Sequence, residues 1–138
     1  MIAPTGPDFE RLIGPMKNFN TERLYILTPK NYDVLAEGII NECAKLNIEC
    51  KKLAVDQNNL WESIFKTTND IVDTHSEIDT EECEKEFIMH TDTGDAELRS
   101  ITTTAAFIAG IKAISFDNNK TNMLPFFRMK YYTSISNK

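Results

Sequence analysis

Two short segments of the chain contain the residue types that bind phosphate or ribose. One is APTGPD, over Ala3–Asp8, and the other is HTDTGDAE, over His90–Glu97. Each combines threonine hydroxyls and a glycine with the expected start of a helix, where backbone N–H groups are free and the helix dipole is positive. Threonine and aspartate also serve simply as helix caps, so one such loop alone is weak evidence. Two of them favour a ligand site if the fold brings them together.

Other kinds of chemistry lack their characteristic residues. The first loop has neither the G-x-G-x-x-G motif nor a Walker lysine. His75 and His90 show no metal-ligand spacing with the cysteines. Asp92, Asp95 and Glu97 have ligand types for a hard cation, but caps and turn residues explain them equally well. No Ser-His-Asp or Cys-His set can be placed, so we expect no metal, no cofactor and no covalent catalysis.

Length and composition indicate one globular domain. The chain has 138 residues, of which 41% are hydrophobic and 26% charged, with few glycines and prolines. A chain of this length supports one compact core, so we expect a single domain over residues 1–138. The formal net charge of −6 argues against direct binding of duplex DNA by this chain, because such binding needs clustered lysine and arginine.

Cysteine usage and hydropathy predict a cytoplasmic protein. Cys43, Cys50 and Cys83 cannot all pair within the chain, and they form no C-x-x-C motif. Reduced, partly buried thiols explain them. The opening stretch MIAPTGPDFE lacks the pattern of a signal peptide. No apolar run approaches the roughly 20 residues that cross a bilayer, so we expect no contact with membranes.

Short β-branched runs alternate with longer stretches of helical periodicity. A short first strand precedes Thr5, and five further runs predict strands. These runs are Arg23–Thr28, Ile48–Val55, Lys85–Thr91, Ile111–Phe116 and the Pro-interrupted Met123–Tyr132.

The first two helices lie before and after the second strand. The first is expected to begin just after Gly6, with Pro7 in its first turn, and to kink or end early at Gly14-Pro15. Asn31 or Asp33 is expected to cap the second. The positions expected to face the core are Phe9, Leu12, Ile13 and Met16 in the first helix and Val34, Leu35, Ile39, Cys43 and Leu46 in the second.

The third and fourth helices are also defined by apolar stripes. Trp61 is expected to be a core anchor of the third, and the fourth is expected to run from Asp95 to near Gly110, although three consecutive threonines weaken it. The inward positions are Leu60, Trp61, Ile64, Phe65, Thr68, Ile71 and Val72 in the third helix and Leu98, Ile101, Ala105 and Ile108 in the fourth.

This alternation of strands and helices predicts an α/β fold, a Rossmann-like three-layer sandwich with a mostly parallel central sheet. Such sheets bind ligands beyond the carboxyl ends of their strands, where the strand order reverses. If the first and fourth strands are neighbours, the loops Ala3–Asp8 and His90–Glu97 open at that point and form one site.

The chain resembles a known family in three stretches. They are MIAPTGPDFERLIGPMKNFNTERLYILTPKN, LNIECKKLAVD and FIMHTDTGDAELRSITTTAAFIAGIKAISFD. These are similar to the CARF domain, the CRISPR-associated Rossmann fold, and closest to the N-terminal sensor domain of archaeal CARF–winged-helix regulators. The stretch MLPFFRMKYY looks like the final strand of those regulators.

The resemblance implies a nucleotide-sensing module. In that family the loops after the first and fourth strands form a pocket, two domains pair around a two-fold axis, and the joint pocket receives a cyclic oligoadenylate. A homodimer is also expected because LPFFRMKYY would otherwise expose several aromatic side chains. The residues expected to bind a cyclic or linear nucleotide are Thr5, Gly6, Asp8, Lys30, Thr91, Asp92, Thr93, Gly94, Asp95 and Arg99.

Charge in the second loop opposes this ligand. Asp92 and Asp95 would repel a polyphosphate unless Arg99 or a cation offsets them. Two alternatives therefore stay open. One is a ring nuclease, in which Thr93, Lys30 and Arg99 align the ribose 2′-OH for metal-independent cleavage of the cyclic oligoadenylate. The other is a dimerisation scaffold that binds no ligand.

Overall fold

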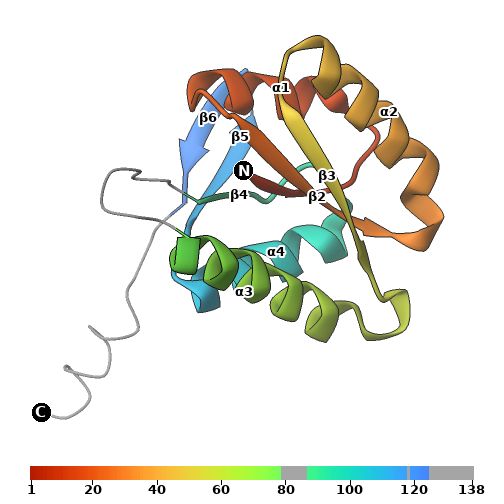
Figure 1. Ribbon diagram of the computed structural model, residues 1–138, viewed down its shortest axis with the longest axis vertical. Coiled ribbons are helices and arrows are strands. Elements are labelled where there is room, and N and C mark those ends of the chain that lie inside the picture. Colours follow the sequence, from red (N-terminus) through yellow and green to blue (C-terminus); the bar gives the residue numbers. More distant parts are fainter. Residues whose placement is uncertain (79–86, 118, 125–138) are drawn as a thin grey trace, which may run out of the picture.

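The structure, a computed structural model, describes residues 1–78, 87–117 and 119–124. A six-stranded sheet in the order β3-β2-β1-β4-β5-β6 lies between two layers of helices (Figure 1). Strand β6 is antiparallel to β5, and the other neighbours are parallel, which confirms the predicted Rossmann-like α/β fold. The elements are β1 (Ile2–Pro4), α1 (Phe9–Asn18), β2 (Arg23–Pro29), η1 (Lys30–Tyr32), α2 (Asp33–Lys45), β3 (Glu49–Val55), η2 (Gln57–Asn59), α3 (Leu60–Ile78), β4 (Ile88–His90), α4 (Ala96–Ala109), β5 (Lys112–Asp117) and β6 (Lys120–Met123).

Strand β1 lies in the middle of the sheet although it has only three residues. Ile2 lies opposite Tyr25 of β2 on one side and Met89 of β4 on the other. The first and fourth strands are therefore neighbours, which is the condition under which the two loops open at one point of the sheet. Because the strand order reverses between them, their carboxyl ends open the crevice at which sheets of this kind bind ligands.

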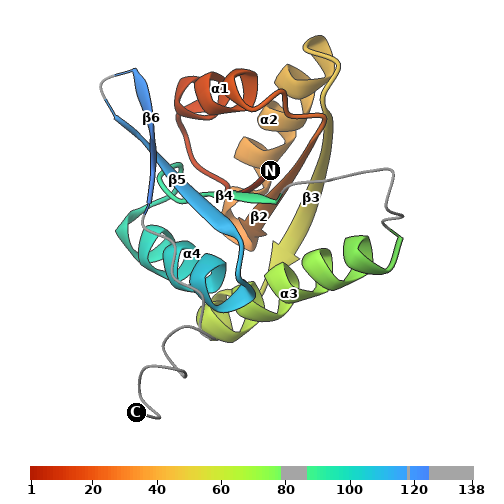
Figure 2. The same ribbon diagram turned by 90° about the vertical axis from the view of Figure 1, so that its left-hand side faces the viewer.

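The two faces of the sheet form two separate cores. Successive residues of a strand point to opposite faces, so Ile2 and Leu27 pack towards α3 and α4, whereas Ala3 and Ile26 pack towards α1 and α2. Figure 2 shows the two helix layers on either side of the strands. All four of these side chains are fully buried, so the short central strand is held from both faces.

Helix α4 follows the prediction at both ends. Asp95 is its N-cap, and Gly110 ends it in the left-handed conformation at φ 72°, which glycine adopts without strain. The hydroxyls of Thr102, Thr103 and Thr104 each donate to a carbonyl one turn earlier. These bonds satisfy the polar groups of three residues that otherwise disfavour a helix.

Helix α1 differs from the prediction in its start and its length. It begins at Phe9 with Asp8 as N-cap, so Pro7 lies before the first turn and not within it. Pro15 is inside the helix, which continues to Asn18 without the expected early end. The helix tolerates Pro15 because the carbonyl that the proline leaves without a helical partner has found another donor, as described below.

The predicted caps of α2 are wrong. Tyr32 occupies the N-cap position and provides no side-chain hydrogen bond. Asp33 is already the first helical residue, and Asn31 lies in the preceding turn η1. The chain enters α2 directly from the 3-10 turn η1, with no side-chain cap between them.

Several apolar positions predicted to face the core are exposed. Val34 is 86% exposed, Ile108 52% and Trp61 46%, and Leu35 and Leu46 are also on the surface. Ala36, Ile39 and Cys43 form the buried side of α2 instead. With 3.6 residues per turn, a residue two positions from Ala36 is turned by about 200°, which places Val34 on the solvent side. Trp61 contacts Phe65 edge-on instead of entering the core.

Most strand predictions agree with the structure. Strands β2, β3 and β5 lie within one residue of the predicted runs, and β4 is shorter than its run. Strand β6 was not predicted, since only Met123 overlaps the run Met123–Tyr132. The rest of that run beyond Leu124, and with it most of LPFFRMKYY, lies outside the described residues.

Two further sequence predictions concern cysteines and membranes. Cys43 and Cys50 are free thiols in contact with each other on the α2 side of the sheet, while Cys83 lies outside the described residues. Among helices in the part of the chain that the structure describes, none has the length and hydropathy of a transmembrane span.

Candidate functional site

The two loops predicted to form one site lie at the same edge of the sheet and touch each other. Gly6 packs so closely on the second loop that a Cβ atom there would lie 1.4 Å from the Thr93 carbonyl oxygen. The Thr93 hydroxyl donates to the Pro4 carbonyl oxygen over 2.6 Å. The predicted proximity of the two loops is therefore confirmed. Glycine at position 6 allows the two loops to touch each other. The space beside its Cα atom is filled by the Thr93 carbonyl oxygen and not by a ligand.

The second loop glycine also has a packing role. A Cβ atom on Gly94 would lie 2.8 Å from Leu98 Cβ and 3.2 Å from Pro4 Cβ. Gly94 thus lets the first turn of α4 sit directly against the end of β1. This contact fixes where the N-terminus of α4 lies relative to the central strand.

The threonine hydroxyls of the predicted site are committed to the protein. Thr5 and Thr28 share a hydrogen bond of 2.8 Å, and Thr28 donates to Ile26. Thr91 donates to the Ile114 carbonyl oxygen over 3.0 Å. The side chains of Thr5, Thr91 and Thr93 are at most 5% exposed. These hydroxyls connect neighbouring strand ends, so they hold the loops in place and do not face an open cleft.

The two aspartates at the helix starts act as caps. Asp8 accepts from the Glu10 N–H over 3.1 Å and Asp95 from the Leu98 N–H over 2.9 Å. A cap satisfies only one of the amide groups that a first turn leaves without an acceptor. The positive end of each helix is therefore retained at the crevice, next to one carboxylate.

His90 joins the second loop to α1. Pro15 has no N–H, so the Arg11 carbonyl oxygen lacks its helical donor. His90 Nε2 lies 2.9 Å from that oxygen and donates to it. His90 Nδ1 accepts from the Asp92 N–H over 3.3 Å. The ring is fully buried, and both nitrogens are used, so His90 is a structural residue between α1 and β4.

This arrangement defines the protonation state of His90. Burial lowers its pKa below the ordinary value of 6.5, against smaller opposing effects of the Arg11 carbonyl and Asp92. A lowered pKa means that the neutral ring stabilises the fold above pH 6.5, and that this stabilisation is lost as the pH falls below it. NMR of the imidazole nitrogens is expected to show the proton on Nε2 and a titration midpoint below about 6.5. A proton on Nδ1 would contradict the contact with Arg11, and a midpoint at or above that value would contradict the burial of the ring.

The charge of Asp92 is compensated by a neighbouring arginine of the protein. Its Oδ1 atom pairs with Arg11 Nη1 over 3.1 Å, and its Oδ2 atom accepts from the Phe116 N–H over 2.7 Å. The carboxylate is only 9% exposed. The predicted repulsion between Asp92 and a phosphate is therefore largely offset by Arg11, which also lies 3.7 Å from Asp8.

A cleft of about 470 Å³ opens beside these groups. Arg11 of α1 and Arg99 of α4 lie on its wall, and Asp117 of β5 adds a carboxylate. The Arg99 side chain is exposed, and its guanidinium has no hydrogen-bond or ion-pair partner among the described residues. The cleft therefore offers one guanidinium held in place by Asp92 and one that is available to a ligand. Its lining residues are Arg11, Thr91, Asp92, Arg99, Thr103, Ser115, Phe116, Asp117 and Leu124.

Only part of the predicted site lines this cleft. Thr91, Asp92 and Arg99 do. Lys30 is exposed in η1, at the end of β2. The others lie beside the cleft in the loop contact and the caps; they are Thr5, Gly6, Asp8, Thr93, Gly94 and Asp95.

Sequence reasoning missed Arg11. Arg11 lies in the first turn of α1, 81 positions away from Asp92, and no local motif connects them. One signal was present: Pro15 is four residues after Arg11, so the Arg11 carbonyl had to find a donor outside the helix. That donor is in the second loop, which brings the guanidinium to the same place.

Neither comparisons with known proteins nor a metal-binding cluster identifies the function of the cleft. The chain matches no protein-family model, and no curated protein is significantly similar to it. Within residues 1–78, 87–117 and 119–124, no three His, Cys, Asp or Glu side chains are grouped so as to hold a metal ion. The cleft is therefore interpreted from its own geometry and charge.

Proposed function

We propose that this chain is a CARF-like sensor domain that binds a nucleotide in the cleft at the carboxyl edge of its sheet. The observation that carries this proposal is the convergence of Arg11 and Arg99 on one cleft beside the N-termini of α1 and α4. Guanidinium groups form strong, directional hydrogen bonds with phosphate oxygens. Helix N-termini favour the same negatively charged groups. The ligand class is a cyclic oligoadenylate or a related linear nucleotide.

The two arginines have different roles in this proposal. Arg11 is oriented by Asp92, so it presents a fixed but partly compensated charge. Arg99 lies in the first turn of α4, and its guanidinium has no partner among the described residues, so it makes the main contact with phosphate. Asp95 and Asp117 remain near the cleft and weaken the binding of an anion.

The size of the cleft favours a shared site. A volume of about 470 Å³ is within the range of small-ligand pockets and suits one part of a cyclic oligonucleotide better than the whole ring. Two copies related by a two-fold axis would supply two such clefts to one symmetric ligand. The proposal therefore includes a homodimer with one ligand for two chains.

Binding is favoured over cleavage by the state of Thr93. The nuclease alternative needs its hydroxyl near the ribose 2′-OH, but that hydroxyl donates to the Pro4 carbonyl oxygen, and Thr93 is only 5% exposed. A role in catalysis would require this contact to break and the two loops to separate. The sensor proposal needs neither change.

Calorimetry with cyclic tetra-adenylate tests this function. The wild type is expected to bind one ligand per two chains, and Arg99→Ala is expected to bind at least about tenfold more weakly, the effect of losing a charged hydrogen bond. Lys66→Ala, which removes an exposed charge from α3, is the control and should bind like the wild type. Absence of heat with the folded wild type, or equal losses in the two variants, would contradict the proposal. A shortened linear product in subsequent chromatography would favour the nuclease.

A further inference from the structure

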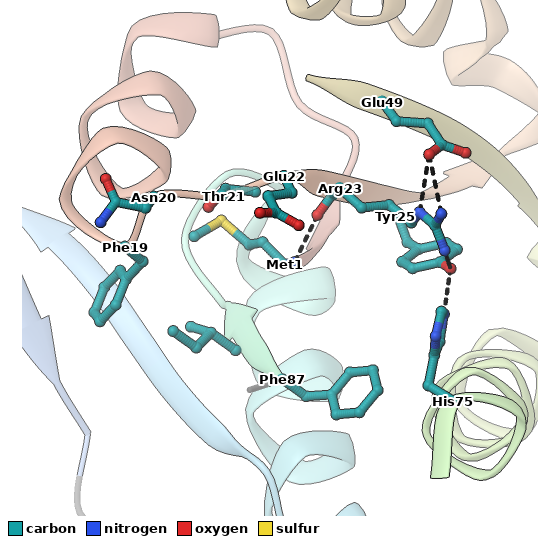
Figure 3. A pocket seen from close by; sticks show the side chains of 11 residues that line it. Met1, Phe19, Asn20, Thr21, Glu22, Arg23, Tyr25, Glu49, His75 and Phe87 are labelled. Atoms are coloured by element: carbon teal, nitrogen blue, oxygen red, sulfur yellow. Dashed lines mark hydrogen bonds and ion pairs between the residues drawn. The ribbon is translucent and has the colours of Figure 1, made fainter. Parts of the chain in front are cut away.

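A second pocket lies at the opposite, amino edge of the sheet. It has a volume of about 450 Å³ and is formed where four parallel strands begin. Met1 directly precedes β1, and Arg23, Glu49 and Ile88 are the first residues of β2, β3 and β4; all four line the pocket. Figure 3 shows Met1, Arg23 and Glu49 around it. The rule that α/β sheets bind ligands at carboxyl ends does not account for this pocket. It is separate from the cleft beside Arg99.

One side of the pocket is a chain of hydrogen bonds. Arg23 donates from Nε and Nη2 to the same Glu49 oxygen over 3.1 and 3.0 Å, and from Nη1 to the Tyr25 hydroxyl over 3.3 Å. The Tyr25 hydroxyl also makes a short hydrogen bond with His75 Nε2. The Arg23 charge is thus paired with Glu49, and its guanidinium is occupied on three nitrogens.

Another part of the pocket lining is apolar and aromatic. Phe19 and Phe87 lie on either side of the Met1 side chain in Figure 3, and Ile88 also lines the pocket. The Phe87 ring centroid is 5.6 Å from that of His75. Aromatic faces attract cations as well as apolar groups. This wall therefore suits a ligand that has an apolar or aromatic body.

The charge left over in the pocket is negative. Glu22 is exposed, and its carboxylate has no partner among the described residues; the second oxygen of Glu49 is likewise not engaged. Arg23 compensates Glu49 only, so the Glu22 charge remains. The Met1 amino group donates to the Arg23 carbonyl oxygen, and burial lowers its pKa to about 6, so it adds little positive charge at pH 8.

We propose that this pocket binds a small organic cation. Its ammonium or amidinium group lies at Glu22 and the free Glu49 oxygen, where charged hydrogen bonds form, and its apolar body lies against Phe19 and Phe87. An anion is disfavoured because Arg23 is already paired and Glu22 is not. The net charge of −6 on the chain also attracts a cation over longer distances. This proposal does not depend on nucleotide binding at the other edge.

The probes are benzamidinium, a planar aromatic cation, and neutral benzamide, which has nearly the same shape. In an NMR titration at pH 8, benzamidinium is expected to shift the amide signals of residues 19–23 and 87–88 and to bind better than benzamide. Glu22→Gln should weaken benzamidinium binding by about threefold to fivefold, as expected for one exposed charge pair. Glu62→Gln, which changes an exposed carboxylate on α3, is the matched control and should leave binding unchanged.

Three results would overturn the proposal. They are equal binding of benzamide and benzamidinium, shifts that cluster away from the amino edge, and Glu22→Gln binding as tightly as the wild type. Because Glu22 is exposed and its side chain makes no hydrogen bond or ion pair with the described residues, its replacement is not expected to disturb folding. Denaturation of Glu22→Gln in urea checks this.

Discussion

Replacement of Gly6 by alanine is expected to lower the free energy of unfolding by about 4 kcal/mol or more, in the range reserved for severe steric changes. A Cβ atom at this position would lie 1.4 Å from the Thr93 carbonyl oxygen, and that oxygen belongs to the backbone of a buried loop. The loop has no rotamer change that would make room. Urea denaturation followed by circular dichroism measures the effect.

The control for this substitution is Gly38→Ala. Gly38 lies inside α2, and a Cβ atom there meets no atom within 4 Å. Alanine is favoured over glycine inside a helix by roughly 1 kcal/mol, so this variant is expected to be slightly more stable than the wild type. If Gly6→Ala were as stable as the wild type, the loops after β1 and β4 would not be packed against each other as the structure has them.

Replacement of Asp92 by alanine is the second large effect that we expect. It should lower the free energy of unfolding by about 2–3 kcal/mol, because the Phe116 N–H loses its acceptor and Arg11 loses its partner. The loss is not larger because the Arg11 side chain is 40% exposed, so water replaces part of the lost interaction. Asp92→Asn retains an oxygen for the Phe116 N–H, so it should cost less than Asp92→Ala. Denaturation curves of both variants give the comparison.

Asp117→Ala is the matched control for Asp92. Asp117 lines the same cleft but is exposed and has no side-chain partner among the described residues. Its replacement is expected to change stability by less than about 0.5 kcal/mol. Equal effects of Asp92→Ala and Asp117→Ala would show that the contacts of Asp92 with Arg11 and the Phe116 N–H do not form in solution.

The mostly parallel sheet and the start of α4 could be predicted because they follow from local patterns. Alternating strands and helices fix a parallel sheet, and Asp95 and Gly110 define α4 through local capping alone. Both loops were found for the same reason. The exposure of Trp61 could not be predicted, since its helical spacing fits the apolar stripe and only the packing of α3 on the sheet decides which edge of that stripe is covered.

The details of the site depended on contacts between distant residues. Thr5 and Thr28 are 23 positions apart, and His90 and Arg11 are 79 apart. In the sequence the Thr5 hydroxyl and the Asp92 carboxylate look available to a ligand, but in the structure each already binds a distant residue of the protein. The pocket at the amino edge was missed because its residues come from the starts of separate strands and share no motif.

The central claim is that a nucleotide binds beside the loop contact, with Arg99 as its main protein cation. An NMR titration of the backbone amides with cyclic tetra-adenylate tests this most directly, because it locates the ligand as well as detecting it. We predict that the largest shifts occur at residues 91–99, with smaller shifts around Arg11, and that Arg99→Ala reduces them at equal ligand concentration. Two results would contradict the claim. One is a set of shifts confined to the amino edge of the sheet. The other is the absence of shifts in the folded protein at about 1 mM ligand, a concentration at which even weak specific binding is detected.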